Sequence, residues 1–486
     1  MTSEANPSSA VNPFADSLRA MNRAHELAHA FVASLPHRPV SRQLTPEAMA
    51  AALDESLPEE SCDPASAVAE WFERAEPGIV ASAGPRFFGY VVGGVTPAAL
   101  AGDWLASAID QMAGLWPGSP AAAQTELVVL RWLKELFGLP AEWAGTITSG
   151  ATMGNLVGLA AARQWAGERL GFDPAVDGLG GHSPISVVSS TAIHASAVKS
   201  LGTLGFGRES VRKVAAPDGR VDLAALERAL ADVDGPVIVI ANAGEVNTGQ
   251  FDDITGVADL CALHSNGAWL HIDGAFGLFA AATPRFRHLV RGIERADSVA
   301  ADGHKWLNVP YDCGFAFVRD AVLLRAAFAV SGPYIAGSAG WDADDYGPEM
   351  SRRFRALAAW CALKAYGRDG YRALVERCVD NAVSFAHWID AAPELELMNR
   401  ERMLGAPFNI VCFRYAPANL DDAATDALNR AAVAAIQADG RVFVTGTTWA
   451  GRTAIRAAFD NWSTTPTDVD VLQATVAEIG HQLRSI

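Results

Sequence analysis

The sequence lacks the features that would assign a chain to a membrane or to the secretory route. No apolar run approaches the ~18 residues of a transmembrane helix, so none is expected. The N-terminus has neither the basic start nor the apolar core of a signal peptide. The six cysteines are scattered without CxxC spacing. They fit free thiols better than a disulfide framework or a zinc site, which predicts a protein of the reducing cytoplasm.

Positive charge is also scarce. Lysine and arginine total 38 against 55 acidic residues, which gives a formal net charge of -17. Nucleic acids and anionic membranes need a positive footprint on their partner, so neither is expected here, and a small-molecule substrate is the default. Half of the 486 residues are hydrophobic, which is enough for a substantial core. The length predicts one large domain and at least one smaller one.

The pattern along the chain divides it into three parts. Helical periodicity dominates as far as Pro140, and short apolar runs alternate with helices from Gly145, which is typical of a mainly parallel sheet. We predict an N-terminal tail and helical segment at 1–90, a large α/β domain at 91–380 and a small α+β domain at 381–486. In such sheets, binding sites lie at the carboxyl ends of the strands.

Two of the predicted strands end in an acid and an amine. The run Gly267–Asp273 ends in a carboxylate, and a second run from Ser298 ends just before His304 and Lys305. An acid and a lysine at strand ends, with small residues beside them so that a flat group can approach, suit pyridoxal 5'-phosphate. Asp273 would keep the pyridine nitrogen protonated, and Lys305 would form the Schiff base. The alternative for such a pair is a buried salt bridge.

Two further stretches fit the same cofactor. The segment Thr146–Asn155 ends a strand and opens a helix with small residues, which exposes backbone N–H groups that suit a phosphate. Many helices begin with Ser or Thr only as caps, so the pattern alone is weak. His194 lies between a strand and a helix, where an imidazole could stack on a flat ring. A lone histidine is more often structural.

The first predicted helix contains the pattern HExxH, from His25 to His29. On a helix this spacing puts both histidines on one face, where they could bind zinc with Glu26 as base. No third ligand is announced, and Glu47 and Asp54 are candidates only in principle. We favour a partly exposed amphipathic helix, keep a zinc peptidase as a distant alternative, and predict no metal site.

Two glycine-rich loops interrupt the helices. The loop Gly84–Gly94, with two phenylalanines and a tyrosine, suggests the lining of a cleft, although a packed turn is the alternative. The loop Ser331–Trp341 contains Tyr334 and is typical of a mobile lid. Three arginines open the next long helix: Arg352, Arg353 and Arg355. Such arginines usually face solvent, but one could bind a carboxylate or phosphate.

Together these residues resemble the pyridoxal-phosphate-dependent amino acid decarboxylases, which include the aromatic amino acid, histidine and glutamate enzymes. The similarity runs from about Phe14 to the C-terminus and is strongest from Trp269 to Cys313, with the family's acid-to-lysine spacing. It implies the α/β transferase fold type I: a mainly parallel seven-stranded sheet in a large domain, an N-terminal helical segment and a small C-terminal α+β domain. It also implies a homodimer with the active site at the interface.

The resemblance implies a role for each matching residue. The residues implied to be catalytic are Lys305, Asp273, His194 and Tyr334, the last as the residue that protonates the substrate carbon. The implied cofactor-binding set is Gly150, Ala151, Thr152, His194, Thr248, Asp273, Ala275, His304 and Lys305. The implied substrate-binding set is Tyr90, Val91, Val92, Gly93 and Trp116.

The chain departs from the family at four of the places compared. The family's Asn-Pro before His-Lys is Asp302-Gly303 here, and a carboxylate near a phosphate would repel it unless it points elsewhere. The aromatic enzyme's threonine run becomes the segment Glu245–Thr248. The loop Val91–Gly93 replaces Phe-Pro-Thr, and Gly114 replaces a phenylalanine. The cofactor half of the site is therefore better matched than the substrate half.

The implied activity is decarboxylation of an L-amino acid to its amine and carbon dioxide. Small residues at Gly93 and Gly114 would leave room for a bulky side chain, which favours an aromatic substrate. An aminotransferase or a carbon–carbon lyase on the same scaffold is the alternative. An aminotransferase normally grips the α-carboxylate with an arginine, whereas a decarboxylase leaves it in a less polar place. The pattern around Arg352 does not decide between them.

Overall fold

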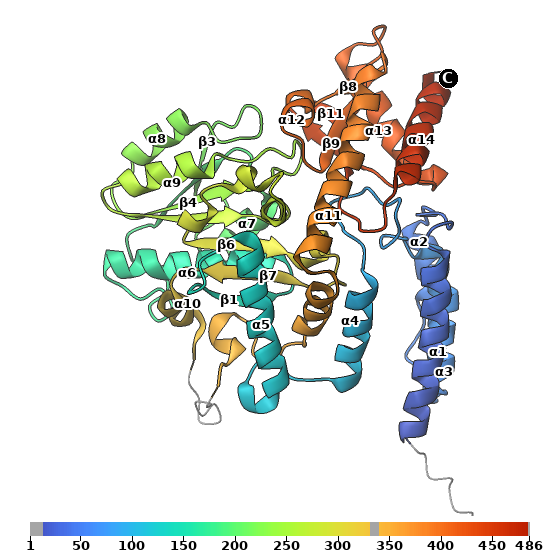
Figure 1. Cartoon of the computed structure of the whole chain (residues 1–486), viewed down its shortest axis with the longest axis horizontal. Coiled ribbons are helices and arrows are strands. Elements are labelled where there is room, and N and C mark those ends of the chain that lie inside the picture. Colours follow the sequence, from blue (N-terminus) through green and yellow to red (C-terminus); the bar gives the residue numbers. More distant parts are fainter. Residues whose placement is uncertain (1–12, 331–339, 485–486) are drawn as a thin grey trace, which may run out of the picture.

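The computed structural model of the chain describes residues 13–330 and 340–484. In Figure 1 the N-terminal helices stand at the right of the view, the body is built on a large sheet, and the C-terminal region lies above them. Helices cover both faces of the sheet, so the body is a three-layer α/β structure.

The large sheet has seven strands in the order β1-β7-β6-β5-β4-β2-β3. The strands are β1 (Ala144–Thr148), β2 (Ser186–Ser190), β3 (Val211–Val214), β4 (Val237–Asn242), β5 (Ala268–Asp273), β6 (Ser298–Asp302) and β7 (Gly314–Val318). Neighbouring strands are parallel except that β7 runs antiparallel to both β1 and β6. The predicted mainly parallel, seven-stranded sheet is confirmed.

Two separate apolar cores lie on the two faces of this sheet. The helices on one face are α6 (Ala151–Leu170), α7 (Ala195–Thr203) and α10 (Ala321–Phe328). Those on the opposite face include α5 (Pro120–Phe137), α8 (Leu223–Ala231) and α9 (Ile254–Leu263). The short helical turns of the chain lie at 76–78, 116–118, 277–282, 287–290, 293–295, 303–307 and 343–346.

Helix α6 lies unusually close to the sheet because glycines face it. A Cβ at Gly154 would be 2.7 Å from the carbonyl oxygen of Phe315, and one at Gly158 would be 2.8 Å from the His271 ring. Both distances are too short for carbon, so the close packing depends on glycine at these positions. As a result, the first turns of α6 lie against the carboxyl ends of β5 and β6.

Alternation along the strands then decides which side chains meet α6. Successive residues of a strand point to opposite faces, so every second residue of β5 and β6 faces the helix. On this side of the sheet, five strand residues make hydrogen bonds: Trp269, His271, Asp273, Ser298 and Asp302. A polar layer therefore lies between α6 and the sheet, at the edge where binding sites of parallel sheets occur.

The N-terminal helices lie beside the body. Helix α1 (Pro13–Ser34) packs along α3 (Pro64–Ala75), with the ring of Phe31 edge-on to that of Phe72 at 6.5 Å. Helix α2 (Pro46–Leu53) contacts α3, and α4 (Pro97–Ile109) packs on the long helix α11 (Ala356–Ala391). This arrangement leaves much of α1 exposed to solvent.

The HExxH residues lie on this exposed helix. The rings of His25 and His29 are 6.0 Å apart, and His25 meets Trp104 edge-on at 5.8 Å. Glu26 pairs with Arg23 at 3.0 Å. Within the described ranges, no three or more His, Cys, Asp or Glu side chains come together in a way that could hold a metal ion. Among the described residues, His25 and His29 therefore have no third side chain with which to bind the zinc ion of a peptidase.

The C-terminal region has its own antiparallel sheet in the order β10-β11-β9-β8. Its elements are β8 (Leu395–Leu397), α12 (Arg400–Gly405), β9 (Ile410–Tyr415), α13 (Asp422–Asp439), β10 (Thr445–Trp449), β11 (Arg452–Ala458) and α14 (Pro466–Arg484). This is the small α+β unit that the sequence predicts. Helix α11 leads into it after a kink at Gly367 and continues through residue 380. The boundaries at residues 90 and 380 stay predictions.

None of the helices in the described part of the chain has the length and apolar character needed to span a bilayer. All six cysteines are unpaired, and four of them are buried.

Candidate active site

Lys305 lies in a single turn of π-helix, η6 (Gly303–Leu307), directly after β6. Asn308, with a left-handed backbone at φ 53°, ends the turn. The Lys305 Nζ is 3.1 Å from Asp302 Oδ2 and 5.8 Å from the centre of the Phe276 ring. Because the lysine side chain is only 18% exposed, its ammonium group depends on these neighbours for stabilisation.

The predicted substrate loop contacts this turn through its backbone. The Gly93 N–H donates to the His304 carbonyl oxygen at 3.2 Å, and a Cβ at Gly93 would lie 1.8 Å from the carbonyl oxygen of Lys305. Val91 is 4% exposed and packs into the core of the body. The structure therefore brings the predicted loop and the predicted lysine together, and glycine is what allows this approach.

Tyr90, at the start of the same loop, has a left-handed backbone at φ 58° and is 60% exposed. Its carbonyl oxygen accepts a hydrogen bond from Arg456 Nη2 at 3.1 Å, and Arg456 Nη1 donates to the Val246 carbonyl oxygen at 2.8 Å. A buried arginine of the C-terminal sheet therefore joins the predicted substrate loop to the turn that contains Thr248.

Asp273 is the last residue of β5 and is 5% exposed. Its Oδ2 accepts a hydrogen bond from Asn155 Nδ2 at 2.9 Å, and its Oδ1 accepts one from the backbone N–H of Ala275 at 3.2 Å. Both oxygens therefore have a donor, which fixes the plane of the carboxylate. Asn155 comes from α6, and the close packing of that helix on the sheet delivers it.

A chain of hydrogen bonds continues behind Asn155. The indole Nε1 of Trp269 donates to Ser298 Oγ at 2.9 Å, and Ser298 Oγ is 2.8 Å from His271 Nδ1. His271 Nε2 is 2.9 Å from Asn155 Oδ1. All four side chains are buried.

The Asn155 amide fixes the direction of this chain, because its Nδ2 donates to Asp273 and its oxygen, which faces His271, can only accept. Nε2–H of His271 therefore donates to Asn155 Oδ1. In a neutral ring Nδ1 then accepts the proton of Ser298, whose oxygen also accepts the indole N–H of Trp269. Burial lowers the pKa of His271 to about 4, so its ring is neutral at neutral pH, as this direction requires.

His194 is the N-cap of α7 and is connected to the same amide. Its Nδ1 accepts a hydrogen bond from the Ser196 N–H at 3.2 Å and lies 2.7 Å from Ser196 Oγ. Ser196 Oγ in turn accepts from Asn155 Nδ2 at 3.1 Å. The ring is exposed, so one face stays accessible while its edge is held.

The predicted phosphate turn opens α6 beside Lys305. The Ala151 N–H donates to Asp302 Oδ1 at 2.5 Å, and a Cβ at Gly150 would lie 3.3 Å from this oxygen and from the His304 ring. His304 Nε2 is 3.5 Å from Asp302 Oδ1, and burial lowers the pKa of His304. Thr152 is exposed at the same turn. The structure thus brings the predicted residues of this turn together with Lys305.

Thr248 lies in a turn that is closed on Glu245. Its hydroxyl donates to Glu245 Oε2 at 2.8 Å, and its N–H donates to the same oxygen at 2.7 Å. Its carbonyl oxygen accepts from Asn399 Nδ2 at 2.9 Å. The hydroxyl therefore has a partner inside the turn, and the implied role of Thr248 toward a cofactor stays a prediction.

Known proteins share the pattern of this chain over most of its length. The family described as the pyridoxal-dependent decarboxylase conserved domain matches residues 46–416, which include every residue of the geometry above except Arg456. The chain belongs to the pyridoxal-dependent decarboxylase family.

Several relatives of this decarboxylase have names or solved structures. Aromatic-L-amino-acid decarboxylase of Bacillus atrophaeus is 31% identical over 405 residues, which cover 81% of this chain and 80% of the relative. Tryptophan decarboxylase 1 of Oryza sativa subsp. japonica is 30% identical, with coverages of 79% and 77%. Phenylacetaldehyde synthase of Arabidopsis thaliana is 26% identical, with 79% of each chain covered. The crystal structure of Oryza sativa TDC with PLP and tryptamine superposes with a TM-score of 0.89 at 26% identity over 99% of each chain.

The residues of the decarboxylase fit pyridoxal 5'-phosphate. They supply a lysine amine, a carboxylate with a fixed plane at Asp273, an imidazole held by its edge at His194, and backbone N–H groups in the first turn of α6. Asp302 uses one of these N–H groups, and its carboxylate is directed at Lys305 and His304. The carboxylate that replaces the family's asparagine is therefore compensated by neighbouring donors.

One expectation about the substrate pocket was wrong. Gly93 and Gly114 do not leave room for a bulky side chain, because backbone fills the space beside them. A Cβ would lie 1.8 Å from the Lys305 carbonyl oxygen at Gly93 and 2.0 Å from the Met350 carbonyl oxygen at Gly114. The Trp116 N–H donates to Asp342 Oδ1 at 2.7 Å, and its implied role in substrate binding stays a prediction. Tyr334, the predicted proton donor, lies outside the described residues.

The three arginines after the second loop all have carboxylate partners. Arg352 pairs with Glu126 at 3.0 Å in the core, and Arg353 pairs with Asp103 at 2.9 Å. Arg355 binds Asp312 at 2.8 Å and Glu349 at 2.9 Å. None of the three is therefore left to grip a substrate carboxylate, which is the feature expected of an aminotransferase.

Sequence reasoning missed Asn155, His271 and Asn308. His271 carries a local signal, since it lies two residues before Asp273 and so shares its face of the strand. Asn155 is a single amide in an otherwise small and apolar helical run, and such a residue in a core needs a partner. No local pattern announces that His271 and Asn155 bind each other.

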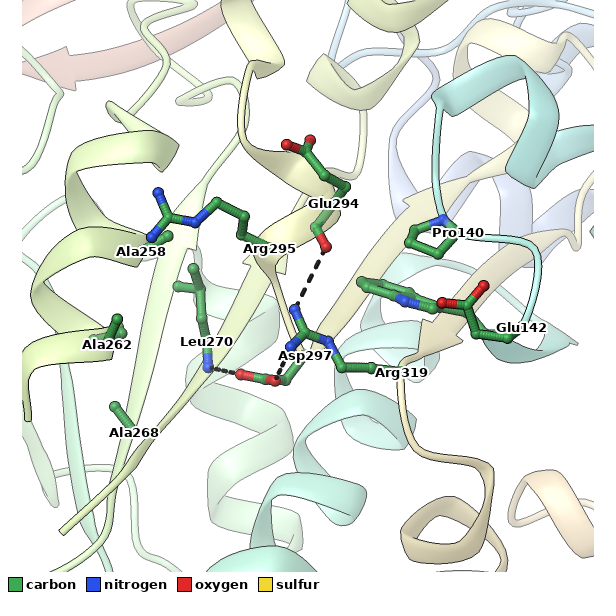
Figure 2. A pocket seen from close by; sticks show the side chains of 12 residues that line it. Pro140, Glu142, Ala258, Ala262, Ala268, Leu270, Glu294, Arg295, Asp297 and Arg319 are labelled. Atoms are coloured by element: carbon green, nitrogen blue, oxygen red, sulfur yellow. Dashed lines mark hydrogen bonds and ion pairs between the residues drawn. The ribbon is translucent and has the colours of Figure 1, made fainter.

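A separate pocket lies at the opposite ends of β5 and β6 (Figure 2). There Arg319 lies between the Glu294 carbonyl oxygen and Asp297, and Asp297 also accepts the Leu270 N–H at 2.8 Å. None of the predicted site residues lines it. The predicted residues Asp273 and Lys305 lie instead at the carboxyl ends of these strands.

Proposed function

We propose that this decarboxylase acts on an L-amino acid with an aromatic side chain and releases the corresponding amine. The observation that carries this proposal is the similarity to relatives named for aromatic substrates at 30–31% identity over 79–81% of the chain. The fold supports the same proposal, because the structure of an enzyme solved with PLP and tryptamine superposes over 99% of both chains. The matched region includes the loop Tyr90–Gly93, which contacts the lysine turn, and Trp116.

The chain's own residues divide the work. Pyridoxal phosphate, when bound, supplies the electron sink that accepts the electron pair left by carbon dioxide. Lys305 would hold it covalently, Asp273 would bind its ring nitrogen, and the α6 turn would bind its phosphate. Asn155 holds Asp273 in one plane, so the sink is oriented before substrate arrives. The packed loop at Gly93 excludes water from the lysine side.

The pairing of Arg352, Arg353 and Arg355 supports decarboxylation over transamination. Leaving the departing carboxylate without a bidentate grip favours its loss, because an ionised carboxylate is stabilised by such a grip and carbon dioxide is not. The test of this proposal must also detect an aldehyde product, because phenylacetaldehyde synthase is one of the relatives.

The substrate test is carbon dioxide release from each of the twenty amino acids by the protein loaded with pyridoxal phosphate, with the organic product identified by mass spectrometry. We expect the highest kcat/KM for an aromatic amino acid and an amine as product. Lys305→Ala should lose both the activity and the visible absorbance band, whereas Lys364→Ala, on the exposed side of α11, should keep both. A preference for an acidic or a small amino acid would contradict the aromatic substrate, and an aldehyde product would contradict the amine.

We infer that the protein is a homodimer with its active site at the interface. Large apolar side chains are exposed on α1, α3 and α4, among them Leu18, Met21, Trp71, Trp104 and Leu105. A second copy of the chain would bury them. Sedimentation of the loaded protein should give twice the chain mass of 51.3 kDa. A monomer that retains full activity would contradict the inference.

We propose a cytoplasmic location. The free thiols support it, since all six cysteines are unpaired and disulfides are rare in reducing compartments. Cell fractionation with an antibody to the chain should recover it with cytoplasmic markers. Recovery with a periplasmic, secreted or membrane fraction would contradict the proposal.

A further inference from the structure

Asp460 is a buried carboxyl group to which the roles above assign no task. It follows β11 and is 1% exposed. One of its oxygens accepts a hydrogen bond from the Val92 backbone N–H, whereas Oδ2 has no partner in the part of the chain that the structure describes. A buried polar atom without a partner costs about 1–3 kcal/mol, so a site that retains one needs an explanation.

The backbone of Asp460 is fastened to that of Lys305 by one side chain. Asn308 Nδ2 is 3.0 Å from the Lys305 carbonyl oxygen and 3.0 Å from the Asp460 carbonyl oxygen. On the other side, Val92 donates to Asp460 while its neighbour Gly93 donates to the His304 carbonyl oxygen at 3.2 Å. Asp460, the η6 turn and the substrate loop therefore form one packed unit.

Two cations act on the Asp460 carboxyl group, Lys305 and Arg456. Two donors of the Arg456 guanidinium are committed to backbone, since Nη1 and Nη2 donate to the Val246 and Tyr90 carbonyl oxygens at 2.8 and 3.1 Å. The Arg456 Nε is buried and has no partner among the described residues, but a guanidinium does not give up its proton in a protein. A lysine ammonium carries three donors and can lose a proton, and within the described residues Lys305 pairs with Asp302 at 3.1 Å. Lys305 is therefore the cation that can give a proton to Asp460.

The remaining titratable groups around Lys305 are uncharged at neutral pH. Burial lowers the pKa of His304, and burial together with Asp302 and Asp460 raises the pKa of Tyr311 to about 12. These two groups therefore add no charge to the surroundings of Lys305 and Asp460 at neutral pH.

The lysine has to lose a proton before it can act. A nucleophilic amine must be neutral, and Asp302 at 3.1 Å stabilises the ammonium form instead. Burial raises the pKa of Asp460 to about 7, in the range where a group exchanges protons at neutral pH. Asp460 can therefore serve as the base that removes the proton from the Lys305 ammonium group.

We propose that Asp460 accepts the proton of the Lys305 ammonium as the lysine side chain turns away from Asp302. In this step an N–H bond of Lys305 Nζ breaks and an O–H bond forms on Asp460 Oδ2. The products are a neutral amine and a neutral carboxyl group, so charge and protons balance without a further reactant. The inference rests on the proposed role of Lys305 as the residue that holds the cofactor.

The test is the rate at which the apoprotein captures pyridoxal phosphate, followed by its visible absorbance band on both sides of pH 7. Asp460→Asn keeps the size of the side chain and an acceptor for Val92, but removes the base. We expect its capture rate to fall at least about tenfold above pH 7 and to lose the inflection near pH 7. A simple charge effect predicts the reverse, because losing a negative charge favours the neutral amine. An unchanged or faster rate would therefore overturn the proposal.

Two further variants separate a proton role from a packing role. Asp460→Glu keeps the acid but adds a methylene, so a proton role predicts a faster capture rate than in Asp460→Asn, and a packing role predicts a slower one. Asp297→Asn removes a carboxylate at the opposite end of β6 and should capture at the wild-type rate. If Asp460→Glu is slower than Asp460→Asn, Asp460 is not the base. If the wild-type protein forms no band at all, the role of Lys305 fails as well.

Discussion

At the scale of single residues, one amide holds together several parts of the site. Asn155 donates to Asp273 and to Ser196, whose N–H donates to the His194 ring, and it accepts from His271. The side chain is fully buried, and both its amide nitrogen and its oxygen have partners. Replacing it would therefore leave buried groups unsatisfied as well as releasing the Asp273 carboxylate.

Asn155→Ala should weaken both stability and cofactor binding. It leaves Asp273 Oδ2 and His271 Nε2 without partners, which costs on the order of 1–3 kcal/mol for each group. Urea unfolding measures the stability, and titration of the apoprotein with pyridoxal phosphate measures the affinity. As a matched control, Asn381→Ala removes a buried amide of α11 that donates to the Thr464 carbonyl oxygen. It should lose stability and keep affinity; equal affinity in both variants would contradict the role of Asn155.

Asp460 should make the stability of the apoprotein fall as pH rises. Its pKa is about 7 in the folded chain, above the ordinary value of 3.8, so the folded state binds more protons between these values. The contribution of protonated Asp460 to the free energy of unfolding is therefore fully present below about pH 4. It is lost as the pH rises through 7, which lowers the free energy of unfolding by up to about 4 kcal/mol. Unfolding in urea at acidic and alkaline pH should show Asp460→Asn gaining over the wild type only at the higher pH. A gain that does not depend on pH would contradict this.

At the scale of elements, the site depends on backbones that pass within van der Waals distance. The loop Tyr90–Gly93 lies against η6, and α6 lies against β5 and β7. Two side chains stabilise these backbone contacts by hydrogen bonds to carbonyl oxygens. Arg456 donates to the Tyr90 carbonyl oxygen, and Asn308 donates to that of Lys305. The position of Lys305 is therefore set by how closely its neighbours can approach.

Gly93→Ala should displace the lysine turn. The added methyl group would lie 1.8 Å from the Lys305 carbonyl oxygen, so the loop or η6 must shift, at a cost of about 1–3 kcal/mol. We expect a lower melting temperature and slower capture of pyridoxal phosphate. Gly405→Ala, in α12, meets no atom within 4 Å and should behave as the wild type in both measurements. Normal capture by Gly93→Ala would show that η6 tolerates a shifted loop.

At the scale of the whole molecule, the N-terminal helices expose several large apolar side chains that the roles above leave unexplained. Helix α1 packs on α3, yet Leu18 is 62% exposed and Met21 is 54% exposed, and Trp71 of α3 is 57% exposed. Helices α1 and α3 lie beside the body rather than against its large sheet (Figure 1). The exposed surface fits burial against a second chain.

Replacing Leu18 and Met21 together by Glu should dissociate the proposed dimer. Two carboxylates on this face would have to be buried without partners in the interface, which is strongly unfavourable. Analytical ultracentrifugation should show a monomer, with loss of activity if the site lies at the interface. Val176→Glu changes a residue that is 80% exposed in a loop beyond α6 and should stay dimeric. Dimers in the double variant would place the interface elsewhere.

The fold class was predictable because periodicity is a local property. Alternation of apolar strands and helices from Gly145 onward marks the mainly parallel sheet. The positions of Asp273 at the end of β5 and of Lys305 just after β6 follow from where each apolar run stops. The cofactor and the family also follow from residues close together in the sequence. The interpretation of Gly93 and Gly114 failed because a glycine gives no sign of what fills the space beside it.

The sequence by itself determined the kind of sheet, the acid, the lysine and the family, since each is encoded in short runs with their own spacing. Only the tertiary structure decided what holds them. Asn155 reaches Asp273 across 118 positions, Arg352 finds Glu126 across 226, and Asn308 reaches Asp460 across 152. Contacts between segments so far apart depend on how closely the elements pack, and packing is a property of the whole fold that no local pattern contains.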